Sequence, residues 1–196
     1  AVDTSGENNI LLYPGANHKN TQEAIGAALS QANAGDWLLM QNETNNQSYA
    51  AATAKTLGLS VGYAAAPFDA QAVQAVMGSL DLLILNAVEA EQLHQATGHS
   101  PAQLPVRDII VTLGAEGCLW YGTEGQQQFE AIAVEPVDTT GAGDTFTGYV
   151  LAGLDRGMPM AQAISLGIKA AGLMVTRLGT ADVIPDLKDL QDSQLI

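Results

Sequence analysis

The chain has 196 residues, and its 7 Lys and Arg against 21 Asp and Glu give a formal net charge of −14. This acidity argues against a nucleic-acid-binding protein, which needs basic side chains to replace the counterions of phosphates, and against electrostatic attachment to anionic membranes. Because 47% of the residues are hydrophobic and the only cysteine is Cys118, we expect a globular protein without disulfides in a reducing, cytoplasmic setting.

The first part of the chain alternates short apolar runs with alanine- and glutamine-rich stretches. The apolar runs have strand length and predict strands at residues 10–13, 37–40, 59–64, 82–85 and 109–111. The stretches between them predict helices at residues 21–32, 46–57, 69–77 and 88–97. Strands that are apolar on both faces are typical of parallel strands covered by helices. The alternation therefore predicts an α/β fold with an open, mostly parallel sheet flanked by helices.

The last part of the chain has a different pattern. Residues 117–121 and 127–134 predict two antiparallel strands around a turn at 122–125, at an edge of the sheet. Two helices are predicted to follow, at 141–156 and 160–177, and a short helix after Pro185. The length fits a single domain over residues 1–196. The chain has no apolar window near the ~18 residues of a membrane-spanning helix, and its first residues show neither the basic nor the apolar region of a signal peptide, so none is expected from them.

The segment Gly141-Ala142-Gly143-Asp144 lies at the predicted start of a helix. The first amides of a helix have no partner within it, and small residues let an anion approach them closely. A P-loop is excluded because Gly-Lys occurs nowhere in the chain, and a dinucleotide fingerprint is excluded because Phe146 occupies the position of its third glycine. Two interpretations remain open at this point. The segment is either a glycine-rich turn with Asp144 as a capping acid, or a phosphate site with Asp144 as a general base.

The residues 138–146, Asp-Thr-Thr-Gly-Ala-Gly-Asp-Thr-Phe, resemble the second signature of the PfkB, or ribokinase-like, family of carbohydrate kinases. Three further segments resemble family motifs in the same order along the chain: 86–89, 112–117 and 175–180. Within the family the likeness is closest to ribokinases, through residues 6–8, 15–17 and 40–43. The resemblance implies a ribokinase-like, Rossmann-like α/β fold and an enzyme that transfers a phosphoryl group from ATP to a sugar primary hydroxyl, with ribose as the acceptor.

The resemblance also implies a role for each matching residue. Asp144 would be the catalytic base and would contact the substrate, and the amides of Gly141, Ala142 and Gly143 would form the anion hole. Asn86 and Glu89 would act on Mg²⁺ and the phosphates, and Glu43 would contact the sugar. The nucleotide would be bound by Thr112, Gly114, Ala115, Glu116 and Gly117. The backbone carbonyls of Asp138 and Thr140 would hold a K⁺-like ion.

The sequence departs from the family at its beginning. The strand with a sugar-binding aspartate, the Gly-Gly region and the Gly-Lys-Gly-x-Asn segment of ribokinase-like chains are absent. Residues 1–16 would correspond to the remnant of the lid region, so the fold is expected to be N-terminally truncated relative to the family. A truncated gene product, half of a split protein and part of a longer chain remain open. The lid implies either a homodimer or a partner fragment.

Three alternatives to a ribose kinase remain. Another sugar or nucleoside kinase of the family would share every motif. A catalytically inactive nucleotide-binding fragment would bind ATP without transfer, and a purely structural domain would bind no nucleotide. Taken alone, Asn86 and Glu89 fit a strand end and an exposed helix residue, and Glu43 fits a loop carboxylate. The three histidines show no metal-ligand spacing.

Overall fold

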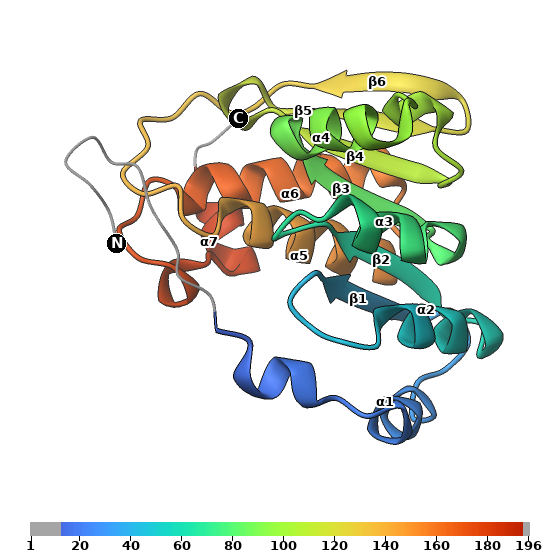
Figure 1. The fold of residues 1–196 in the computed structure, drawn as a ribbon. Helices are drawn as coiled ribbons and strands as arrows, with labels where there is room; N and C mark the ends of the chain where they lie inside the picture. The colour runs from blue at the N-terminus through green and yellow to red at the C-terminus, as the bar shows by residue number, and fades with distance from the viewer. Residues whose placement is uncertain (1–12, 194–196) are drawn as a thin grey trace.

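The computed structural model of the protein describes residues 13–193, whose strands form one six-stranded sheet in the order β1 to β6 (Figure 1). The first four strands are parallel: β1 (Trp37–Gln41), β2 (Ser60–Ala64), β3 (Leu82–Asn86) and β4 (Asp108–Thr112). The last two form an antiparallel hairpin: β5 (Cys118–Gly122) and β6 (Gly125–Phe129). The mostly parallel sheet with an antiparallel hairpin at one edge is therefore confirmed.

Helices cover both faces of this sheet (Figure 1). One face carries α2 (Gln47–Thr56), α3 (Ala70–Val76) and α4 (Ala87–Thr97), and the other carries α5 (Ala142–Asp155) and α6 (Met160–Met174). Helix α1 (Gln22–Leu29) packs against α2, and α7 (Leu187–Asp192) packs against α6. Short 3-10 turns lie between these elements: Gly15–Lys19, Met77–Ser79, Pro101–Gln103, Gly114–Glu116 and Ala181–Val183.

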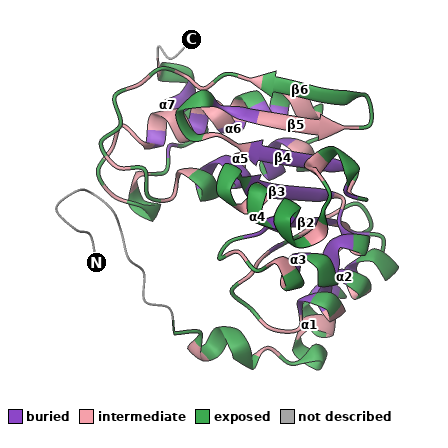
Figure 2. Ribbon diagram, turned by 45° about the horizontal axis from the view of Figure 1, so that its top comes forward, coloured by how far each residue is buried: buried purple, intermediate pink, exposed green. Residues whose placement is uncertain are grey.

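The alternation of side chains along the strands produces a separate core on each face. Leu83 and Leu85 point into the cluster beneath α2, α3 and α4, whereas Leu82 and Ile84 point into the cluster with α5 and α6. All four are almost completely buried, as the colour of β3 in Figure 2 shows. Full burial of such a side chain contributes about 1.5–3 kcal/mol. The two cores fix α5, whose first turn carries the candidate site, against the sheet.

Several predicted boundaries differ from the structure; the second hairpin strand and the long helix α6 are two of them. The second hairpin strand was predicted to reach residue 134 but ends at Phe129, which pairs with Cys118, the first residue of β5. Beyond that pair no strand residue is left to bond with, so residues 130–134 continue without regular structure. Helix α6 ends at Met174 instead of 177, and the Val175 carbonyl accepts hydrogen bonds from the amides of Val137 and Asp138. Of the strand predicted at 10–13, residues 10–12 lie outside the described residues.

Within residues 13–193, none of the helices has both the length and the apolar character needed to cross a membrane.

Candidate active site

The chain makes a tight turn before α5. Gly141 has φ = +82°, a left-handed conformation that a residue with a Cβ atom adopts only at a cost. Asp138 stabilises the turn, because its carboxylate accepts hydrogen bonds from the amides of Thr140 (2.9 Å) and Gly179 (3.4 Å). The bonds from Thr140 lower the pKa of Asp138, since they favour its charged form. The turn thus sets the direction in which α5 begins.

The amides at the start of α5 are partly free. Among residues 13–193, no hydrogen-bond partner is found for the amides of Gly141 and Gly143, whereas the Ala142 amide donates to the Thr139 carbonyl at 3.2 Å. Gly143 is exposed, and a Cβ added to it would meet no atom within 4 Å. Free amides at a helix N-terminus, together with the helix dipole, favour a bound anion. Two of the three predicted amides therefore have the freedom that anion binding requires.

Asp144 lies in the first turn of α5 and is exposed. Its Oδ1 accepts a hydrogen bond from Gln41 Nε2 at 2.8 Å, and no other side-chain partner is found among the described residues. Gln41 is the last residue of β1, so the bond joins the carboxyl end of the sheet to the N-terminus of α5. Asp144 is therefore neither buried nor consumed in an ion pair, and its Oδ2 remains free to accept a proton.

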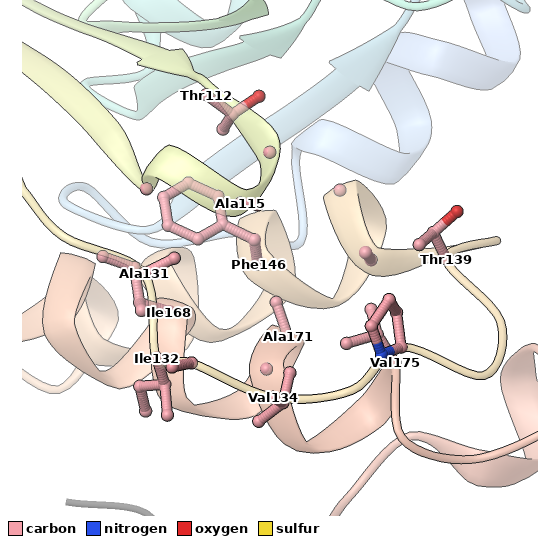
Figure 3. Close-up of a pocket in the computed structure, with 17 residues that line it drawn as sticks. Thr112, Ala115, Ala131, Ile132, Val134, Thr139, Phe146, Ile168, Ala171 and Val175 are labelled. Atoms are coloured by element: carbon pink, nitrogen blue, oxygen red, sulfur yellow. The ribbon is translucent and has the colours of Figure 1, made fainter.

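A cavity of about 480 Å³ opens beside this helix start (Figure 3). Four of the residues predicted to bind nucleotide line it, namely Thr112, Gly114, Ala115 and Gly117, and so do Ala142 and Gly143 of the turn. The other walls are mostly apolar: Ala131, Ile132, Ala133, Val134, Pro136, Thr139, Phe146, Ile168, Ala171, Gly172 and Val175. A mostly apolar cavity with a few polar groups at one end is typical of a small-molecule site.

Gly117 lies in the connection between β4 and β5, has φ = +89° and lines this cavity. A Cβ at this position would collide with the Phe129 carbonyl of the neighbouring strand and lie 2.7 Å from the Ala131 amide. Only glycine lets the chain after β6 pass this close. The predicted residue Glu116, which follows Ala115 in the same 3-10 turn, is exposed and is not among the residues that line the cavity.

Asn86 and Glu89 form the N-terminal capping box of α4. The Glu89 amide donates to Asn86 Oδ1 (2.9 Å), and the Asn86 amide donates to Glu89 Oε2 (2.7 Å). Partial burial raises the pKa of Glu89. Neither residue lines the large cavity. Asn86 of β3 is, however, the strand partner of Thr112 of β4, and Thr112 lines that cavity.

The described part of the chain holds no group of three or more His, Cys, Asp or Glu side chains that could bind a metal. Mg²⁺ often binds through one or two carboxylates, several waters and the phosphates of its substrate. The carboxylate of Glu89, in the first turn of α4 just after β3, is a ligand type that fits such a metal ion when a nucleotide supplies the phosphates. The carbonyls of Asp138 and Thr140 accept no hydrogen bond from any residue of 13–193, which leaves them free to bind a monovalent cation.

Glu43 lines a second, separate cavity of about 350 Å³. Its walls combine apolar residues of α1 and β1 with the polar side chains of Asn17, Asn45 and Gln47. Gln41 belongs to this cavity and also binds Asp144, which directly follows Gly143 of the first cavity. Asp144 therefore lies between two cavities, one largely apolar and one with polar walls.

Several residues of the site were not found from the sequence. The sequence shows Gln41 only as part of a segment that resembles ribokinases, and no local pattern indicates its contact with Asp144, which lies 103 residues away. Ile168, Ala171 and Val175 were predicted only as helix residues, yet they form one wall of the cavity. Residues 131–134 were assigned to a strand. The small and apolar side chains of these segments were the only available signal.

An open, mostly parallel sheet with a cavity beside a glycine-rich helix start is typical of α/β proteins that bind nucleotides. The sequence agrees, since residues 1–187 match the family model described as pfkB family carbohydrate kinase. This chain belongs to the pfkB family of carbohydrate kinases, and the predicted family membership is confirmed.

Individual relatives support the same assignment. The chain is 29% identical to a ribokinase from Staphylococcus aureus over 96% of its own length and 66% of the relative. A ribokinase structure from Thermotoga maritima superposes with a TM-score of 0.83 at 31% identity, over 97% of this chain and 66% of that one. The ribokinase structure from Arabidopsis thaliana, complexed with ribose and ATP, has a TM-score of 0.77, 25% identity and the same coverages. The chain thus spans just under two thirds of the length of each of these three relatives.

Proposed function

We propose that the protein acts as an ATP-dependent sugar kinase that phosphorylates the primary hydroxyl of ribose. The observation that carries this proposal is the position of Asp144, next to free helix amides and between two cavities of different character. Similarity to ribokinases, one of them with bound ribose and ATP, supports the choice of ribose and ATP.

The larger cavity would bind the adenosine part of ATP. Its apolar walls suit an adenine ring, and Ala142 and Gly143 form part of its lining, so the phosphates would extend toward the start of α5. The protein has a net charge of −14, and the loop 137–143 contains no Lys or Arg. Free amides of Gly141 and Gly143, with the positive end of the α5 dipole, would therefore neutralise the charge that develops on the transferred group.

The sugar would bind on the side of Glu43 and Gln41, with its primary hydroxyl directed at Asp144. In the transfer step, the hydroxyl oxygen would attack the γ-phosphorus while Asp144 accepts the hydroxyl proton. The bond between the γ-phosphorus and the bridging oxygen breaks, and ADP leaves with that electron pair. The products are the sugar phosphate and ADP.

Two ions belong to the proposal. Mg²⁺ would supply charge neutralisation on the ATP phosphates, and Asn86 and Glu89 would act on it through water. A K⁺-like ion would be held by the carbonyls of Asp138 and Thr140 and would stiffen the turn that precedes α5. The charged Asp138 carboxylate beside those carbonyls supports a cation in this place.

The test is a coupled ADP-release assay with the full-length protein and a panel of ribose, deoxyribose, fructose and a nucleoside. We expect the highest kcat/KM for ribose, and Asp144→Asn should lower kcat by about 10²–10⁴, the range for loss of a general base. Thermal unfolding should be nearly unchanged in this variant because Asp144 is exposed. Wild-type turnover by Asp144→Asn would contradict its role as the base, and a preference for another acceptor would contradict ribose.

A nucleotide-binding protein without transfer is the second candidate. The chain spans 66% of the ribokinases from Staphylococcus aureus and Thermotoga maritima, and without sugar contacts from elsewhere it would bind nucleotide but transfer no phosphoryl group. Calorimetry that detects ATP binding, together with no ADP release for any acceptor of the panel, would favour this candidate. A homodimer, or assembly with a fragment that supplies the remaining third, belongs to the same proposal and is tested by light scattering.

A further inference from the structure

We infer that Gln41 is a positioning residue for Asp144, an inference that rests on the proposed function. Gln41 Nε2 donates to Asp144 Oδ1 at 2.8 Å, and no other side-chain hydrogen bond to Asp144 is found among residues 13–193. A carboxylate with one oxygen held presents the other in a fixed direction. The general base therefore takes its orientation from a side chain at the carboxyl end of β1, on the opposite side of the site from α5.

Gln41 is itself held by a chain of hydrogen bonds that begins in the core. Gln47 Nε2 donates to the Gln41 carbonyl at 2.6 Å, and the Tyr63 hydroxyl donates to Gln47 Oε1 at 3.0 Å. Tyr63 is fully buried, and Gln47 is 9% exposed. The chain runs from β2 through the first turn of α2 to the end of β1 and then to Asp144.

The Tyr63 hydroxyl is fixed as a donor in this chain. Burial, with a smaller contribution from the negative charge of Asp69, raises the pKa of Tyr63 to about 12, so the hydroxyl stays protonated at neutral pH. Because Tyr63 donates to the oxygen of the Gln47 amide, the amide nitrogen of Gln47 is directed at the Gln41 carbonyl. Buried polar groups that are all paired in this way fix one geometry.

Gln47 binds the backbone carbonyl of Gln41, whereas Asp144 is bound by its side chain, so the two contacts can be changed separately. Gln41→Met keeps the carbonyl that Gln47 binds and removes only the donor to Asp144. We expect kcat to fall about 10–100-fold, the range associated with a hydrogen bond to a charged group, while KM for ATP and for the sugar changes little. Gln41→Glu keeps the shape but places a like charge beside Asp144, and a larger loss of kcat is expected.

A matched control lies on α4, where Gln95 Nε2 donates to Glu91 Oε1 at 2.8 Å on the exposed surface. Gln95→Met removes the same kind of hydrogen bond away from both cavities, and kcat should be unchanged. The decisive comparison is a double-mutant cycle with Asp144→Ala. If Gln41 acts through Asp144, Gln41→Met causes no further loss in the Asp144→Ala background.

Three results would overturn the inference. Unchanged kcat in Gln41→Met would show that the bond has no catalytic consequence. The same fold loss in the presence and absence of the Asp144 carboxylate would show that Gln41 does not act through it. A rise in the sugar KM with unchanged kcat would make Gln41 a substrate contact instead.

A spectroscopic readout separates this inference from the proposed function. In protein with ¹⁵N-labelled glutamine, the side-chain amide signal of Gln41, assigned with Gln41→Met, should shift in Asp144→Ala, whereas that of Gln95 should not. An unshifted Gln41 signal would overturn the contact itself. If the signal shifts but the wild-type protein phosphorylates no acceptor, the proposed function is wrong and the catalytic role of Gln41 is wrong with it, although the contact is real.

Discussion

Gly141→Ala is the substitution that tests the turn before α5 most directly. An L-residue held at φ = +82° costs about 1–2 kcal/mol, because its Cβ crowds the neighbouring carbonyl. The new Cβ would also lie 2.9 Å from Met174 Cε, the flexible end of a buried side chain that can yield at small cost. Alanine offsets about 0.4–1 kcal/mol of this through the lower entropy of its unfolded chain. With the small cost of moving Met174 included, the expected net loss is about 0.5–2 kcal/mol.

Thermal unfolding followed by circular dichroism measures this loss. For a chain of this length, 1 kcal/mol corresponds to about 2–4 °C, so Tm should fall by about 1–8 °C. Gly143→Ala is the matched control, since its Cβ would meet no atom within 4 Å and its φ is not positive. We expect an unchanged or slightly higher Tm for the control, with weaker ATP binding because the methyl group would enter the cavity beside the free amides. A Gly141→Ala variant whose Tm lies within about 1 °C of wild type would refute the left-handed turn.

Three further predictions concern buried groups. Burial raises the pKa of the Cys118 thiol to about 11, so iodoacetamide at about pH 8 should alkylate it only after unfolding. Mass spectrometry of protein treated in buffer and in urea measures this difference. The pKa of Tyr63 is about 12 in the folded protein and about 10 in the unfolded chain, so the unfolded chain ionises first and the free energy of unfolding falls as the pH rises from about 10 to 12. Urea titrations should show this fall in the wild type and not in Tyr63→Phe. At neutral pH Tyr63→Phe should cost about 1–3 kcal/mol, because Gln47 Oε1 loses its donor. Gly117→Ala, whose Cβ would collide with the Phe129 carbonyl, should cost about 3 kcal/mol or more, and a Tm near that of wild type would contradict the close approach.

The arrangement of the sheet could be predicted because its signals are local. Runs such as 82–85 are apolar at every position, which only a strand covered on both faces requires, and the helices between them follow residue propensity. The same rules failed for residues 131–134, which are also apolar but have no strand to pair with, because β5 begins at Cys118. Whether a segment finds a strand to pair with depends on the whole fold and cannot be predicted from the residues of the segment alone.

The candidate site divides in the same way. The glycine-rich start of α5 follows from residues adjacent in sequence, so its turn and its free amides could be expected from Gly141 to Asp144 alone. The contact of Gln41 with Asp144 depends on the register of β1 against β2 and on the packing of α5, and neither can be read from the segments themselves. The roles inferred for Asn86 and Glu89 stay predictions, because the capping box that they form also accounts for both side chains.

The bond between Gln41 and Asp144 has a consequence for biosynthesis. Its two ends are 103 residues apart, so the ribosome completes one long before the other, and helix α5 must dock before they can meet. An incomplete nascent polypeptide thus has β1 without the carboxylate, and a chain that has opened at α5 loses the pairing at once. The base of the proposed phosphoryl transfer is therefore held in place only in a molecule whose helix α5 is packed against the sheet.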